Sequence, residues 1–148
     1  MSTDAAVTKD LIQTLEDGKD GFAKGAEKLQ GDDATEIAAR FRELSAQRAA
    51  MSDELQELAK DYGDDIDESG TVTAALHRGW MTLKDLAAGS DPEGVLDVAE
   101  QGEDHAVAQF EKALEADISQ GLRAVVERQL VDVRRTHDEV KALRNAHA

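Results

Sequence analysis

The 148-residue chain is 41% hydrophobic and 33% charged, an ordinary composition for one domain with a core of its own. Aromatic residues make up only 3% of it and there is one proline, which favours helices over a sandwich or barrel. A net charge of −15 repels phosphate backbones and anionic lipids, so we expect neither nucleic acid nor a membrane surface as a partner. The chain has no cysteine and its N-terminus lacks the pattern of a signal peptide, so we expect a cytoplasmic location.

Apolar residues recur every three or four positions along four stretches of the chain and predict four long helices. An acidic linker, GDDIDESG, separates the second of these helices from a shorter one. Two long helices, a crossover and two more long helices are the connectivity of a ferritin-like up-down bundle. The sequence therefore predicts an all-α, ferritin-like four-helix bundle that forms a single domain over residues 1–148, with long helices at about 3–29, 33–62, 92–116 and 119–146 and a crossover helix at about 71–88.

Glycines and cap residues mark local features of the first two helices. Gly18 and Gly25 lie on the apolar seam of the first helix, where they indicate close backbone packing against a neighbouring helix rather than a ligand site. Asp33 and Glu36 have the spacing of a capping box, which predicts the start of the second helix.

Charged or titratable residues interrupt the apolar seams of three helices. Arg48, Glu103 and His137 each lie near the middle of a long helix, and Arg134 precedes His137 by one turn. Antiparallel helices of similar length bring their middles to one level, so we expect a buried polar cluster of these four residues. Because a lone buried carboxylate is costly, Glu103 needs a proton, a metal or a cation as its partner. Arg48 has an alternative, since its long side chain can reach the solvent.

The predicted crossover carries the run His77, Arg78, Gly79 and Trp80. Trp80 falls on its apolar side, and His77 lies one turn earlier, where the two side chains can touch. A histidine held against a tryptophan is more often packing than catalysis. This run and the glycine-rich first helix are also where a second copy of the chain could dock, although packing within one chain explains both equally well.

With these residues in view, the chain resembles a ferritin-like four-helix-bundle family whose members carry a domain of unknown function. The resemblance rests on DLIQTLEDGKDGF, GTVTAALHRGW, LDVAEQGEDHAVAQFEKAL and VVERQLVDVRRTHDEV, which cover nearly the whole chain. The crossover stretch with His77, Arg78 and Trp80 is the most specific of them. The resemblance implies the fold and no known reaction.

The resemblance also implies a comparison with the wider ferritin-like superfamily and its di-iron site. That site takes one glutamate from each of two helices and a Glu-x-x-His pair from each of the other two. Here Leu15 stands at the place of one glutamate, Arg48 begins the segment that replaces one pair, and Arg134 stands at the glutamate of the other. Only Glu103 and His137 remain at matching places.

Two hypotheses follow for the function. The first is a non-enzymatic helical bundle without a cofactor, acting in stress physiology or as an interaction module, whose ancestral metal cluster is replaced by buried ionic groups. The second is a ferritin-like metalloprotein that binds or oxidises iron through Glu16, Glu43, Glu103 and His137. Arginines on the same seams disfavour the second hypothesis, because they repel metal ions. No phosphate-binding loop, dinucleotide fingerprint or nucleophile elbow points to another enzyme class.

Overall fold

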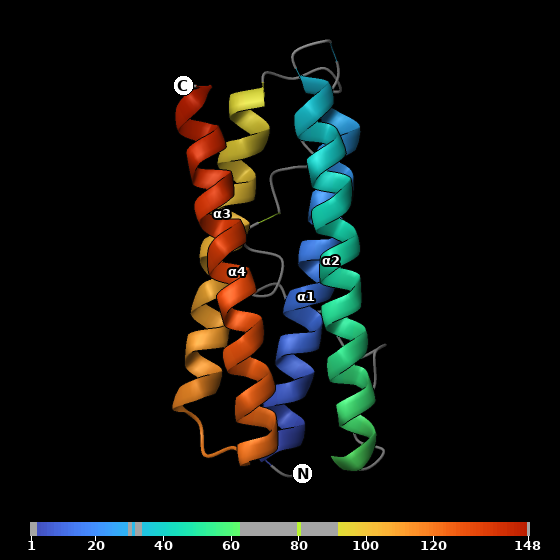
Figure 1. The fold of residues 1–148 in the computed structure, drawn as a ribbon, viewed down its shortest axis with the longest axis vertical. Helices are drawn as coiled ribbons and strands as arrows, with labels where there is room; N and C mark the ends of the chain where they lie inside the picture. Colours follow the sequence, from blue (N-terminus) through green and yellow to red (C-terminus); the bar gives the residue numbers. More distant parts are fainter. Residues whose placement is uncertain (1–2, 30, 32–33, 63–79, 81–91, 148) are drawn as a thin grey trace.

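The computed structural model of the chain describes residues 3–29, 31, 34–62, 80 and 92–147. They form a four-helix bundle without a strand in the described ranges, which confirms the all-α prediction (Figure 1). The bundle consists of α1 (Thr3–Lys28), α2 (Thr35–Ala59), which a 3-10 turn η2 (Lys60–Tyr62) extends, α3 (Pro92–Glu115) and α4 (Gln120–Ala146). These bounds agree with the predicted ones to within a few residues. Except for Trp80, the predicted crossover helix at 71–88, with His77 and Arg78, lies outside the described residues.

The four helices form two antiparallel hairpins that pack side by side (Figure 1). The first hairpin pairs α1 with α2, and the second pairs α3 with α4; α1 also packs on α3, and α4 on α2. Because α2 ends and α3 begins at opposite ends of the bundle, these two helices run in the same direction and lie diagonally across the core. None of the described helices has an apolar stretch long enough to cross a membrane.

The core consists of two apolar clusters with a polar level between them. Along α2, Leu44 belongs to one cluster and Met51 to the other, and Arg48 lies between them. Along α3, Ala99 and Ala106 stand in the same relation to Glu103. The middle of the bundle is therefore the level at which charged residues replace apolar ones, as the seam positions predict.

The N-termini of α2 and α4 differ in how they are capped. The residue before α2 is Ala34, whose side chain provides no cap. The predicted capping box depends on Asp33, which lies outside the described residues. Ser119 caps α4, where its Oγ accepts a hydrogen bond from the amide of Leu122 at 3.3 Å. The amide of Ser119 in turn donates to Oδ1 of Asp4 at 2.9 Å, which ties the start of α1 to the loop between α3 and α4.

Trp80 is buried between α1 and α3, with 9% of its surface exposed. A Cβ atom on Gly21 of α1 would lie 2.2 Å from the indole, and one on Gly102 of α3 would lie 2.3 Å from it. On the predicted seam, Gly25 makes room for the ring of Phe41 in the same way, at 2.9 Å. The sequence predicts that the seam glycines allow the backbones of two helices to approach closely. Instead, the space beside these glycines is filled by large side chains from the neighbouring helix.

The slot for the indole gives a testable prediction. We expect Gly102→Ala to lower the free energy of unfolding by about 1–3 kcal/mol, because a methyl group placed against a packed ring forces side chains or backbone to shift. The measurement is urea denaturation followed by circular dichroism. Gly121→Ala is the matched control in α4: its Cβ would meet nothing within 4 Å, and it should stabilise the helix by up to about 1 kcal/mol. Equal effects of the two substitutions would contradict the slot.

Candidate functional site

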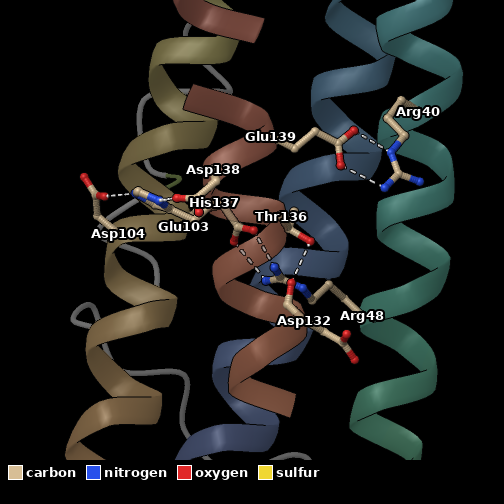
Figure 2. A network of polar contacts seen from close by, with 9 residues as sticks. All are labelled: Arg40, Arg48, Glu103, Asp104, Asp132, Thr136, His137, Asp138 and Glu139. Atoms are coloured by element: carbon tan, nitrogen blue, oxygen red, sulfur yellow. Dashed lines mark hydrogen bonds and ion pairs between the residues drawn. The ribbon is translucent and has the colours of Figure 1, made fainter. Parts of the chain in front are cut away.

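Arg48 of α2 and Glu103 of α3 form an ion pair in the middle of the bundle (Figure 2). Both side chains are 0% exposed. Nη1 of Arg48 donates to Oε2 of Glu103 at 2.9 Å, and Nη2 donates to Oε1. This two-bond fork is the strongest geometry that a guanidinium and a carboxylate can adopt. Because α2 and α3 lie diagonally, the pair crosses the core and joins the two hairpins.

Two residues of α1, Phe22 and Gly18, lie close to the guanidinium of Arg48. The carbon Cζ of Arg48 lies 5.6 Å from the centre of the Phe22 ring on α1, within the range of a cation–π contact. One turn earlier on α1, an added Cβ on Gly18 would lie 3.0 Å from Nη1. Any residue larger than glycine at position 18 would therefore press on the guanidinium.

Burial sets the electrostatics of the pair. Desolvation raises the pKa of the Glu103 carboxyl, and the charge and hydrogen bonds of Arg48 oppose this rise. The charge of His137 also lowers this pKa, to a smaller extent. The pKa remains raised overall, and among the groups that lower it Arg48 contributes most, so Arg48 is the cation that pairs with the buried carboxyl.

His137 lies beside the pair and faces the surface between α3 and α4 (Figure 2). Its side chain is 20% exposed, with Nε2 at 2.5 Å from Oδ1 of Asp104 and Nδ1 at 3.3 Å from Oδ1 of Asp138. Desolvation lowers the pKa of the imidazole, but the hydrogen bonds to Asp104 and Asp138 outweigh it, so the pKa lies above its ordinary value. His137 thus acts on Glu103 through its charge, and its hydrogen bonds link α3 to α4.

The raised pKa of His137 gives a prediction with a definite sign. A proton bound more tightly in the folded state stabilises it fully below the ordinary pKa, and this contribution disappears as the pH rises through the raised pKa. We expect His137→Gln to lower the free energy of unfolding by up to about 1 kcal/mol at acidic pH, since the site is partly solvated. The difference from the parent chain should vanish at alkaline pH, as urea denaturation across the pH range would measure. A difference that does not change with pH would contradict this role.

Arg134 does not join the buried pair. It donates from Nη2 to Oε2 of Glu111 at 2.8 Å, and both side chains are more than half exposed. The prediction that Arg134 belongs to the buried polar cluster is therefore wrong. Arg134 flanks the seam that His137 occupies, and this small rotation around α4 directs its long side chain to the surface.

The four residues of the metalloprotein hypothesis do not form one cluster. Glu16 pairs with Lys19 at 3.0 Å, and Glu43 pairs with Arg40 at 2.9 Å, each within one turn of its own helix. Within the described part of the chain, no group of three or more His, Asp or Glu side chains could hold a metal ion. In the middle of the bundle, the guanidinium of Arg48 faces Glu103. The described residues around Glu103 therefore do not fit a di-iron site.

A set of contacts between α2 and α4 lies outside the sequence predictions. Arg40 donates to both carboxylate oxygens of Glu139, at 2.6 and 2.8 Å (Figure 2). Buried Gln129 donates to the carbonyl of Met51 at 3.1 Å and to Oε1 of Glu54 at 2.9 Å. Opposite charges on exposed faces are too common in this sequence for the pairs to be identified from it.

Asp17 of α1 carries a second buried carboxyl group. The sequence did not predict its burial. Burial raises its pKa to about 7, and the nearby carboxylates of Asp20 and Glu16 add to the rise. Asp17 lies next to Gly18 but off the predicted apolar seam, so periodicity gave no signal for its burial.

Comparison with known proteins places the chain in a family. No curated protein matches it. Residues 5–116 match the model of a domain of unknown function, DUF2383, and the match spans α1, α2 and α3 and so includes both residues of the buried pair. Because this match covers most of the chain, the protein belongs to the DUF2383 family.

Proposed function

We propose that the chain is a non-enzymatic, ferritin-like helical bundle in which a buried ion pair replaces the di-iron site of that superfamily. Two antiparallel hairpins whose second and third helices are parallel support the ferritin-like assignment, because this arrangement needs the single long crossover of ferritin-like folds. The carrying observation is the fully buried fork between Arg48 and Glu103 at mid-bundle.

The pair accounts for the loss of metal chemistry at this level. A divalent ion at Glu103 would lie against the fixed positive charge of Arg48, and the described residues offer no group of three or more potential ligands there. The pair also fixes the position of one hairpin along the other. A shift by one helical turn would separate Arg48 from Glu103 and leave both charges buried without a partner. Such pairs contribute specificity more readily than net stability.

In this proposal the bundle works through contacts with other macromolecules rather than through a reaction. Its net charge of −15 favours protein partners over nucleic acid or anionic membranes, and a second copy of the chain is one such partner. We place this module in the cytoplasm, with a role in stress physiology. Light scattering of the purified chain would determine its oligomeric state.

The iron content of the purified protein tests the proposal against the metalloprotein hypothesis. The chain is produced in iron-rich medium and analysed for metals, with the Glu103→Gln variant as control. We expect no stoichiometric iron in either preparation. A content of about two irons per chain that Glu103→Gln abolishes would overturn the proposal.

A further inference from the structure

We infer that the middle of the bundle is a closed cation site shaped for a guanidinium, and that Arg48 is its tethered occupant. The inference rests on the proposed function, because it concerns the same pair. It goes further by naming the ligand class that the site recognises, which is a small alkylguanidinium cation.

Three walls give the site its selectivity. The two oxygens of Glu103 accept in parallel from two nitrogens of one planar group, a geometry that a guanidinium provides and an ammonium does not. The ring of Phe22 lies 5.6 Å from the central carbon and adds a cation–π contact. Gly18 leaves the space that Nη1 fills. These walls select for charge, planarity and size together.

The size of the site follows from its closure. Arg48 and Glu103 are both 0% exposed, and the two apolar clusters close the site above and below. The substitution Arg48→Ala removes every atom beyond Cβ, and the atoms removed correspond to ethylguanidinium. The vacated cavity should therefore fit this cation best, with guanidinium too small to fill it and butylguanidinium too large.

A metal ion is a poor substitute for the guanidinium. Removing Arg48 leaves Glu103 with His137 beside it, and no described group of three or more potential ligands surrounds this carboxylate. Zinc and iron need about three or four protein ligands to bind firmly. The cavity should thus distinguish an organic cation from a metal ion.

The experiment measures the thermal unfolding of Arg48→Ala with small molecules added at millimolar concentration and at matched ionic strength. Ethylguanidinium should raise the midpoint, and a concentration ten times its dissociation constant should lower the unfolding equilibrium constant about tenfold. N-ethylurea, its neutral isostere, ethylammonium and zinc should have little effect. Butylguanidinium and guanidinium should rescue less than ethylguanidinium. Because Glu103 supplies the anionic wall, the double variant Arg48→Ala with Glu103→Leu should not respond to any of them.

Two further measurements keep the inference falsifiable. Leu55→Ala leaves an apolar cavity at another fully buried position, and a response to ethylguanidinium there would show a nonspecific effect and overturn the site. In the unmodified chain, the Nη protons of Arg48 should give separate nuclear magnetic resonance signals, because the fork prevents rotation, and added zinc should not move them. Merged signals, rescue by zinc or absence of rescue by ethylguanidinium would each overturn the inference.

The outcome can be separated from that of the proposed function. If ethylguanidinium fails to rescue while the chain still purifies without stoichiometric iron, only the guanidinium site is overturned. If the purified chain holds iron that depends on Glu103, the proposed function and the guanidinium site are both overturned.

Discussion

Replacing Trp80 by alanine should lower the free energy of unfolding by about 3–5 kcal/mol, as for other large buried aromatic residues. The indole is 9% exposed, fills the slot between Gly21 and Gly102, and packs edge-on against Phe22 with ring centroids 5.0 Å apart. Its removal leaves a cavity lined by two glycines that have no side chains to fill it. Urea denaturation followed by circular dichroism would measure the loss.

Fluorescence provides an independent measurement, because Trp80 is the only tryptophan in the chain. The native emission should be blue-shifted and poorly quenched by acrylamide, and it should become water-like on unfolding. Trp80→Phe is the matched control, since it keeps an aromatic ring in the slot and should cost less than Trp80→Ala. Native fluorescence that is fully water-like and readily quenched would contradict the burial of the indole.

The bundle and its central pair could be predicted because both depend on periodicity. Residues at helical spacing share one face of a helix, so a charge on an apolar seam, such as Arg48 or Glu103, points toward the neighbouring helices. Similar helix lengths then place these charges at one level. This reasoning needs no atomic detail, and it identified the two residues that the structure brings together.

The details that the sequence did not predict depend on the direction of single side chains. Arg134 lies next to the seam of α4, and a rotation of part of a turn sends it to Glu111 at the surface. Gly21 lies off the seam of α1, yet it makes the space for Trp80. Periodicity defines the face of a helix but does not show which large side chain from elsewhere in the chain fills the space at a glycine.

Replacing Arg48 by methionine should lower the free energy of unfolding by about 3–5 kcal/mol, because Glu103 would remain buried without its cation. Burial already raises the pKa of this carboxyl, and without Arg48 nothing of comparable strength would oppose the rise. The variant must either protonate Glu103 or open the core to water. Urea denaturation at neutral pH would measure the loss. Arg40→Met is the matched control, since its pair with Glu139 is partly exposed and should be worth about 0–1 kcal/mol.

Adding Glu103→Leu to Arg48→Met should recover much of that loss. The double variant has no buried charge at the level of this pair, and methionine and leucine fill much of the same space with apolar atoms that continue the two clusters above and below. Replacement of a buried ion pair by packed hydrophobic residues is often neutral or stabilising, whereas removal of one partner is costly. The two effects should therefore be strongly non-additive in a double-mutant cycle. If they simply add, Arg48 and Glu103 do not depend on each other, and the pair does not hold the two hairpins in register.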